Sequence, residues 1–589
     1  MPLIMSSRPR HRATHSYRSI LGLTGTTILI VLGGLLFAAV LPWLSGRDIA
    51  VSVFRARESE RTPDPEVIEN IRNELDLPSN PLEGVQRFFI GFIHLDFGVS
   101  WVNPSNSAWH TVLAGFGPSV FLAGTATLLG TMIACALIWP RVYAYSQGRR
   151  SHAGLLSSAV LSSVPEFVLA SLLISFIAIQ LGYLPATGWD GLSYAILPVI
   201  SLTIPISGML SRILLIAVDT AANEPWVRTW LVNGIPGYRV RRSLIRRGFA
   251  TLTPQIFLFF AGTLASTALV ENIFSIPGIG RIAVQAATHQ DVPVMQALLT
   301  VVLFIGVACG FLSRCIHYFM MRPVAQSHDA GLSHGHTHID VGWTPPLLAI
   351  IPLVFALLLG SFRSSAITPT ARLEAPSFTH PLGTDQVGRD VLARMADGAI
   401  PTVGIALITT AVCVAIGVII GLSGDWARVL GDTLNALPAV FVGLVIASVF
   451  GTSVWTAAVA VMAVGWIPIA AHCSALALDI RHQGHYEWAR DSGAGRWRLL
   501  VVHTIPFVVP AALRHGATRL GHNILALAGL AFLGIGAGHD SPQWGTMLSE
   551  AAPYADRALW FVLSPTCALI LVGLSTTLLA DHIVGRRRS

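Results

Sequence analysis

The sequence predicts an all-α membrane protein of about twelve transmembrane helices, arranged as two parallel six-helix halves with pseudo-twofold symmetry. Three observations support this fold class. The chain of 589 residues is 53% hydrophobic and only 12% charged, whereas about 25% of the residues in soluble domains are charged. Apolar runs long enough to cross a bilayer, which takes roughly 20 residues, recur along the whole chain. Motifs of the first half also return in the second half after a nearly constant number of residues.

The apolar runs alternate between arginine-rich loops and loops with few charges. The rule that basic residues stay on the cytoplasmic side places the arginine-rich loops and both termini in the cytoplasm. We therefore expect a multi-pass protein of a bacterial inner membrane. In order, the predicted spans are residues 20–43, 117–139, 156–181, 194–217, 254–275, 294–320, 344–362, 401–423, 432–451, 454–479, 505–533 and 559–583.

The segments between the spans divide the chain. Residues 44–116 and 363–400 are long and are expected outside. A polar stretch joins two halves on the cytoplasmic side, which gives a first half at 1–325, a linker at 326–343 and a second half at 344–589.

All 38 basic residues are arginine, because the sequence contains no lysine. Without lysine the chain has no P-loop, so we expect ATP to be bound by another chain. The arginine clusters between apolar runs argue against nucleic acid as a partner, despite the formal net charge of +7. The six cysteines have no metal-binding spacing. We predict no catalytic group, cofactor or metal site.

One cytoplasmic loop motif occurs twice. Residues 224–234 read EPWVRTWLVNG and residues 486–493 read YEWARDSG, and their final glycines, Gly234 and Gly493, are 259 positions apart. A second pair of motifs, 271–280 and 527–536, is 256 positions apart, which pairs Glu271 with Leu527. Six predicted spans separate the copies, so both copies lie on the same face and the halves are parallel.

Longer motifs resemble a known family. The runs LGYLPATG at 181–188 and VENIFSIPGIGR at 270–281 are similar to B-type permease subunits of ATP-binding cassette importers for dipeptides, oligopeptides and nickel. The runs HPLGTDQVGRD at 380–390, FLGIG at 532–536 and WGTML at 544–548 are similar to the C-type subunit. The resemblance covers nearly the whole chain and implies two permeases fused head to tail.

That resemblance gives the repeated loop a role. In the family it is a short cytoplasmic helix that docks on an ATP-binding subunit. A glycine in a left-handed conformation suits the end of such a helix. The residues expected to couple to the ATPase are Glu224, Arg228, Gly234, Tyr486, Ala489, Arg490 and Gly493. The family's usual alanine is present as Ala489 but is replaced by Trp230 and Leu231 in the first half.

Three ionisable residues in or near the spans are candidates for the translocation pathway: Glu166, Glu271 and His472. An ionisable residue in a span is a functional hypothesis by default, although placement at the membrane interface for the two glutamates, and helix packing for the histidine, is the favoured explanation. The histidines at 328, 334, 336 and 338 could bind a transition metal or could belong to a solvated linker. Residues 383–390 also resemble a loop motif of major-facilitator transporters, but that loop is cytoplasmic, whereas this one is expected outside.

The resemblance implies the partners and the solute class. We expect two ATP-binding cassette subunits or domains, an extracytoplasmic solute-binding protein and membrane lipid around the chain. The solute would be a peptide, a metal chelate or another small polar molecule, moved inward. The alternative is a proton-coupled secondary transporter of the major-facilitator type, in which the repeated glycine loops would have no role. A membrane enzyme would need a polar catalytic cluster, and the sequence contains no such motif.

Overall fold

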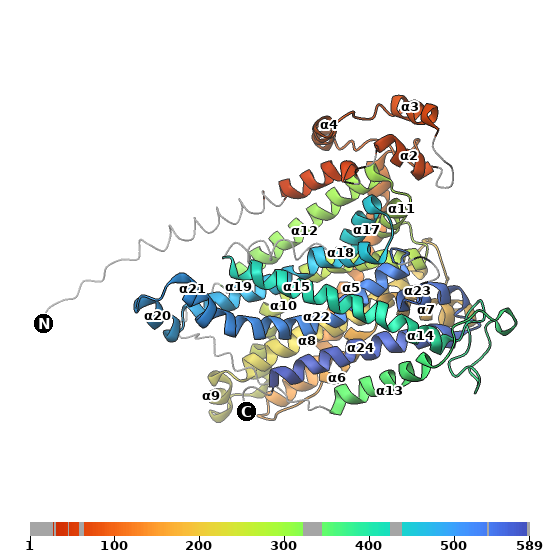
Figure 1. The fold of residues 1–589 in the computed structure, drawn as a ribbon. Coiled ribbons are helices and arrows are strands. Elements are labelled where there is room, and N and C mark those ends of the chain that lie inside the picture. Colours follow the sequence, from red (N-terminus) through yellow and green to blue (C-terminus); the bar gives the residue numbers. More distant parts are fainter. Residues whose placement is uncertain are drawn as a thin grey trace.

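The computed structural model describes residues 28, 31–44, 46, 48–57, 64–321, 344–424, 439–536, 538 and 541–585. Most of these residues belong to long helices that run side by side as one bundle (Figure 1). The predicted linker at 326–343 and its four histidines lie outside the described residues.

Among the described residues, the first half begins with an apolar helix, Val31–Trp43, which is followed by three short helices. Its elements are α2 (Ile49–Arg57), α3 (Pro65–Glu74), α4 (Pro81–His94), α5 (Ala108–Tyr145), α6 (Leu155–Ser163), α7 (Glu166–Leu173), η2 (Ile174–Gln180), α8 (Leu192–Ala222), α9 (Pro225–Val232), α10 (Gly237–Ile273), α11 (Ile279–Thr288) and α12 (Val292–Met321).

The second half follows a similar order. Its elements are α13 (Thr344–Ser361), η3 (Pro369–Ala371), α14 (Val391–Ala399), η4 (Ile400–Gly404), α15 (Ile405–Leu422), α17 (Ala439–Phe450), α18 (Val454–Gly465), α19 (Ile467–Arg481), α20 (Gly484–Asp491), α21 (Arg496–Arg498), η5 (Leu499–Thr504), α22 (Ile505–Phe532), α23 (Trp544–Ala551), η6 (Ala552–Tyr554) and α24 (Leu559–Gly585).

The described helices account for the predicted number of spans. Eight helices are long and apolar enough to cross a membrane, and a ninth candidate is a bent pair. Three shorter apolar helices, Val31–Trp43, Ile350–Ser361 and Val440–Phe450, occupy the remaining predicted positions. The twelve-helix prediction is therefore confirmed in the part of the chain that the structure describes.

Two predicted spans differ from the observed helices. The third predicted span is not straight, because its two parts, Leu155–Ser163 and Glu166–Gln180, meet at 78°. Pro165 has no backbone N–H and disfavours helical geometry in the residue before it, and Val164 is accordingly extended. The fifth predicted span starts at 254, whereas α10 begins at Gly237. Its first turns are polar and basic, so hydropathy marks only the later part of the helix.

The halves repeat with a constant offset. Helices α8 and α19 end 259 residues apart, at Ala222 and Arg481, and so do α10 and α22, at Ile273 and Phe532. After both α10 and α22 the chain turns through a left-handed residue, Ser275 (φ 56°) in the first half and Gly534 (φ 82°) in the second.

This helix end corrects one predicted pairing. Ile276 N–H bonds to the carbonyl of Glu271 at 2.9 Å, and Ile535 N–H bonds to that of Leu530 at 2.9 Å. The residue equivalent to Glu271 is therefore Leu530. The pairing with Leu527 aligned the glycines and overlooked the longer loop that follows α22.

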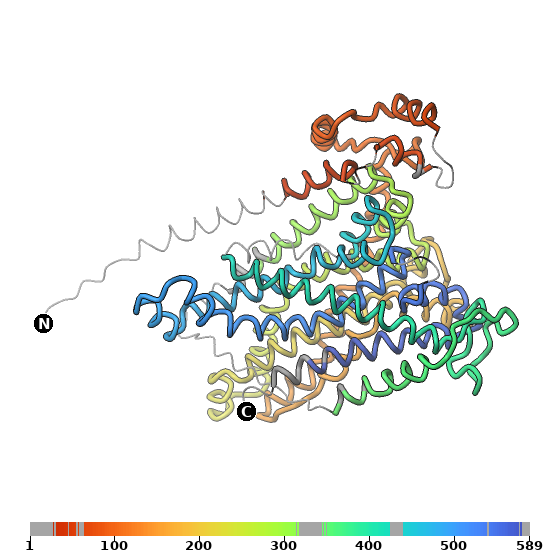
Figure 2. Tube along the Cα trace, in the orientation of Figure 1, coloured from red at the N-terminus to blue at the C-terminus, as the bar shows by residue number. Residues whose placement is uncertain are grey.

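The two ends of the bundle carry different segments. The short helices α9, α20 and α21 lie together at one end, which we call the α9 end (Figure 1). Helices α2–α4 and the loop before α14 lie at the opposite end, which we call the α2 end, and the chain can be followed between these ends in Figure 2. Both copies of the loop motif thus share one end, as the parallel arrangement requires.

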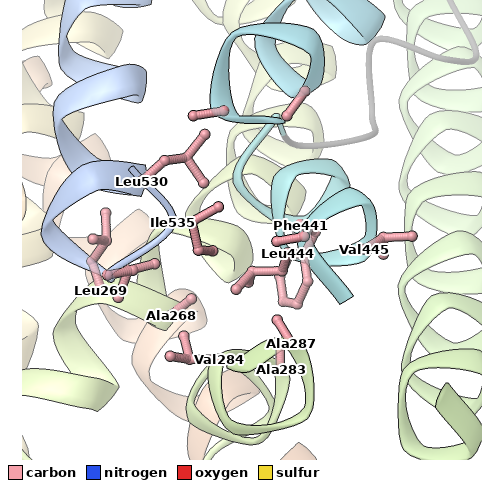
Figure 3. Close-up of a cluster of buried hydrophobic side chains, with 14 of the residues drawn as sticks. Ala268, Leu269, Ala283, Val284, Ala287, Phe441, Leu444, Val445, Leu530 and Ile535 are labelled. Atoms are coloured by element: carbon pink, nitrogen blue, oxygen red, sulfur yellow. The ribbon is translucent and has the colours of Figure 1, made fainter. Parts of the chain in front are cut away.

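The two halves are joined by an apolar contact. Figure 3 shows side chains of α10, α11, α17 and α22 pointing toward one another. Leu269 and Val284 come from the first half, and Leu444 and Leu530 from the second, and all four are buried. Residues on both sides belong to one continuous core, so the halves bury a shared surface.

Candidate functional site

Helix α9 is the first copy of the repeated loop. It begins after Glu224, whose backbone is extended (φ −69°, ψ 146°), with Pro225 in the first helical position. The Glu224 carboxylate accepts a hydrogen bond from Trp226 Nε1 at 2.8 Å and pairs with Arg247 of α10. The Arg247 guanidinium also lies 5.0 Å from the centre of the Trp226 ring. Glu224 therefore fixes α9 to α10.

Helix α20 is the second copy and has the same length. It begins after Gln483, which is 259 positions after Glu224. Tyr486 is half-buried against an apolar cluster between α15, α19 and α22. Ala489 is buried.

Both helices end in the same way. Gly234 has a φ of 67° and Gly493 a φ of 86°, so both are left-handed. The next N–H turns back onto the helix: Ile235 N bonds to the carbonyl of Trp230 and Ala494 N to that of Ala489, each at 3.0 Å. This is a Schellman helix end, in which glycine carries no Cβ penalty.

The same two positions hold each helix against the bundle. Val227 of α9 is buried and corresponds to Tyr486 of α20, while Trp230 corresponds to Ala489. Trp230 packs against the first half's core and meets the Trp226 ring at 5.0 Å. Trp230, which replaces the alanine of α20, thus lies on the face of α9 that contacts the bundle. The larger side chain changes how α9 packs there.

The outward faces of the two helices differ in charge. Arg228 is exposed on α9, and the equivalent residue of α20 is Glu487, also exposed. Val232 is 79% exposed on α9 and Trp488 is 72% exposed on α20. Arg490 is exposed and pairs with Asp491 at 3.1 Å. Both helices present an apolar side chain to solvent among charges of different sign.

Two segments of the chain, residues 126–325 and 413–589, match the family model described as the binding-protein-dependent transport system inner membrane component. Together these segments make up more than half of the chain. The chain belongs to this family. It is a permease component of an ATP-binding cassette importer, with two permease domains fused in one multi-pass membrane protein.

Individual relatives match less than half of the fused chain. A protein described as a peptide permease of Brucella suis is 32% identical over 251 residues, which are 40% of this chain and 83% of the relative. The dipeptide transport system permease protein DppC of Alkalihalophilus pseudofirmus is 30% identical over 243 residues, 40% of this chain and 80% of the relative. The di/tripeptide transport system permease protein DppC of Pseudomonas aeruginosa is 29% identical over 230 residues, 38% of this chain and 76% of the relative.

Glu271 of the permease is fully buried and caps α11. Its Oε2 accepts hydrogen bonds from the N–H groups of Gly280 at 2.8 Å and Arg281 at 3.0 Å. Its Oε1 accepts one from Ser119 Oγ, which itself accepts one from Ile279 N–H at 2.9 Å. Negative charge is favourable at a helix N-terminus. These contacts give Glu271 a structural role as a helix cap, and its candidacy as a pathway residue stays a prediction.

The other two pathway candidates lie in different surroundings. Glu166 begins α7 directly after the bend, and its carboxylate is hydrogen-bonded to Ser266 of α10. His472 on α19 is exposed, and its ring stacks on His515 of α22 with 5.1 Å between the centroids. Of the two, His472 has other titratable groups around it.

An ion network at the α2 end escaped the sequence analysis. The side chain of Asp385 is fully buried, and its Oδ2 accepts hydrogen bonds from Arg389 Nε at 2.7 Å and Arg394 Nη1 at 2.8 Å. Arg394 also bonds to Glu550 at 2.9 Å. The network joins α14 to α23 across more than 150 residues of sequence. Asp385 and Arg389 lie in the motif at 380–390. The sequence alone could not show that the distant Glu550 belongs to the same network.

The outer segment of the first half also carries charge pairs. Arg87 of α4 pairs with Asp76 at 2.9 Å and with Glu83 at 2.7 Å. Hydrogen bonds from Ser79 lower the pKa of the Glu83 carboxyl below its ordinary value. The hydrogen bond to Asp76 raises the pKa of Arg87. Next to them, α4 and the ends of Val31–Trp43 and α12 line a cavity of about 240 Å³.

Proposed function

We propose that the permease imports peptides, that α9 and α20 dock on two ATP-binding cassette subunits or domains, and that the α2 end receives an extracytoplasmic binding protein. The ATP would be hydrolysed by those partners, since this chain has no P-loop lysine. The α9 end would face the cytoplasm of a bacterium, and both chain termini would lie on the cytoplasmic side of the membrane. The family and the names of the relatives support the importer class and the peptide substrate respectively.

The observation that carries the docking proposal is the repeated helix itself. Two eight-residue helices begin 259 positions apart, contact the bundle through equivalent positions and end at a left-handed glycine, and both lie at one end of the bundle (Figure 1). The positive-inside rule constrains the charge of a loop and not its backbone conformation, so it does not explain why the two loops have the same backbone geometry. A helix with a fixed entry and exit transmits a push from a partner to the helices that hold it.

Substitution of the two glycines tests this proposal. An added Cβ would have nothing within 4 Å at either position, so the effect of Gly234→Val and Gly493→Val comes chiefly from the backbone conformation. A branched side chain at a positive φ costs about 1 to 2 kcal/mol and redirects the chain. We expect membrane insertion to stay normal, while peptide uptake and peptide-stimulated ATP hydrolysis fall together, more strongly for Gly493→Val.

The measurement is made in proteoliposomes that contain all subunits. Gly484→Ala is the matched control, because Gly484 lies at the start of α20 without a positive φ and its added Cβ also meets nothing within 4 Å. Normal coupling in the double variant Gly234→Val/Gly493→Val would refute the docking proposal.

A further inference from the structure

A stripe of basic side chains runs along the middle of α22. Arg514, His515, Arg519 and His522 follow one another at intervals of one, four and three residues. At 3.6 residues per turn His515, Arg519 and His522 lie within about 60° of one another on one face of the helix, and Arg514 lies at the edge of that face. His472 of α19 extends the stripe, since its ring stacks on that of His515.

The stripe faces the interior of the permease. His522 lies within electrostatic range of Arg519 and of Arg212, which belongs to α8 of the first half. His472 and His522 are both exposed, although each lies within a membrane-spanning helix. Ionisable side chains in a span face the bundle interior or a water-filled cavity, because lipid does not solvate them. On this ground the basic groups face the protein interior, and His522 reaches the boundary between the halves, where it lies close to Arg212.

This group of cations has unused hydrogen-bond donors. Within the described residues, His515 Nε2 and Arg519 Nε are buried without a hydrogen-bond partner. Among the described residues, the charged or titratable groups that act on His472, His515 and Arg519 are other basic residues and Cys413. Unpaired buried donors next to like charges are costly. An anionic ligand would remove this cost.

The first half has no counterpart to the stripe. The residues 259 positions before His472, Arg514, His515, Arg519 and His522 are uncharged: Ile213, Gln255, Ile256, Phe260 and Thr263. The charge is thus concentrated in the second half, with Arg212 of the first half close to His522.

We propose that Arg212, His472, Arg514, His515, Arg519 and His522 form a basic station that binds a carboxylate of the solute as it passes between the halves. Guanidinium groups offer forked donors that match a carboxylate. The inference rests on the proposed function and narrows it: the permease selects peptides with a free carboxylate at the C-terminus or on a side chain. The basic station consists of residues of this chain alone, so its binding of a carboxylate does not depend on the solute-binding protein.

A reactivity test examines the station without any transported solute. Thr518 lies within the stripe, where its hydroxyl donates to the His515 carbonyl at 2.7 Å and its carbonyl contacts His522 Nδ1 at 3.2 Å. In the full-length chain with its native cysteines replaced by alanine, Thr518→Cys would be treated with an anionic sulfonatoethyl and a cationic trimethylammonioethyl methanethiosulfonate. Their rate ratio cancels differences in access and reports the local charge.

We expect the anionic reagent to react faster, and Arg519→Gln to lower the anion-to-cation ratio about tenfold. Arg514→Gln should lower it as well, which guards against misfolding of one variant. Arg149→Gln, an exposed arginine in the loop after α5, is the matched control and should leave the ratio unchanged. A ratio near one, a ratio insensitive to both substitutions, or a cysteine that neither reagent reaches would overturn the station.

Uptake then tests the solute class. Trialanine and trialanine amide differ in one carboxylate, and their affinities for the binding protein are measured separately so that uptake can be corrected for delivery. We expect Arg514→Gln/Arg519→Gln to reduce trialanine uptake at least tenfold more than uptake of the amide. Equal losses for both peptides would overturn carboxylate binding. If the unmodified permease moves neither peptide, the proposed peptide function fails, while the reactivity ratio still decides whether the station exists.

Discussion

The two halves of the permease agree in backbone at the α9 end and differ in side chains at the opposite end. Helices α9 and α20 have the same length, the same inward positions and the same left-handed glycine end. Beyond α10 and α22, however, the first half uses the buried carboxylate of Glu271 as a cap, whereas the second half has Leu530 at that position.

The difference between the halves has a physical reason. In the second half, the chain from Gly534 to α23 is longer than the corresponding connection to α11, so a carboxylate at position 530 could not cap α23 in the same way. The second half instead holds α23 through Glu550, which bonds to Arg394 of α14. Each half therefore holds its short helix, α11 or α23, by a different polar contact. Helices α9 and α20 nevertheless keep the same backbone geometry.

The largest effect is expected when the ion network of the second half is broken. Asp385→Ala would remove the carboxylate that Arg389 and Arg394 share, and Arg394 is buried. Removal of one member of a buried ion pair costs about 3 to 5 kcal/mol. We expect a marked loss of thermal stability in detergent, together with a lower yield of inserted protein.

The matched control is in the first half. Asp291 is buried and accepts hydrogen bonds from Ser100 Oγ and from Trp101 N–H, the latter at 3.2 Å. Asp291→Ala breaks hydrogen bonds without leaving buried cations, which costs about 1 to 3 kcal/mol. If both variants melt at the same temperature, the contacts of Asp385 and Asp291 stabilise the two halves to a similar extent. The expectation that the ion network of the second half contributes more would then be wrong.

The sequence predicted the repeated elements better than the contacts between them. Twelve apolar runs and two glycine loops were correct because hydropathy and a constant offset can be read locally. The start of α10, the bend at Pro165 and the short helices α11 and α23 were missed, since bilayer length alone says nothing about polar turns or short amphipathic helices. The role of Glu271 depends on Ser119, which lies 152 positions away, and no local pattern gives that contact.

A smaller effect is expected from Glu271, and it separates a cap from a pathway residue. Glu271→Ala leaves the N–H groups of Gly280 and Arg281 without their acceptor. The loss should cost about 1 to 3 kcal/mol and loosen the first turn of α11. Hydrogen exchange of these amides should become faster, while the relative uptake of trialanine and its amide stays the same.

Glu271→Gln provides the control for charge, because the amide oxygen still accepts one of these hydrogen bonds. Its effect on exchange should be weaker than that of alanine. A changed solute preference together with unchanged hydrogen exchange of these amides would indicate that Glu271 acts in the translocation pathway and not as a cap.

The smallest effect concerns the outward faces of the coupling helices. Arg228 and Glu487 occupy equivalent exposed positions with opposite charge, so the two ATP-binding partners should present different grooves. An exposed ion pair contributes about 0.2 to 1 kcal/mol. Arg228→Glu or Glu487→Arg should therefore weaken binding of the ATP-binding subunits by roughly fivefold or less at low salt, and the loss should diminish as salt is added.

The double variant Arg228→Glu/Glu487→Arg decides whether the two grooves differ. It exchanges the charges of the two faces without changing the net charge of the chain. If the partners are two different subunits or domains, each face now meets the wrong charge, and the two losses should add, because the sites are far apart and share no partner.

If the partners are identical, each reversed charge recreates a face that the same groove already accepts. Binding, measured by titration of the purified permease with its ATP-binding subunits, would then return to that of the unmodified chain, and the opposite charges of α9 and α20 would have no role in partner choice.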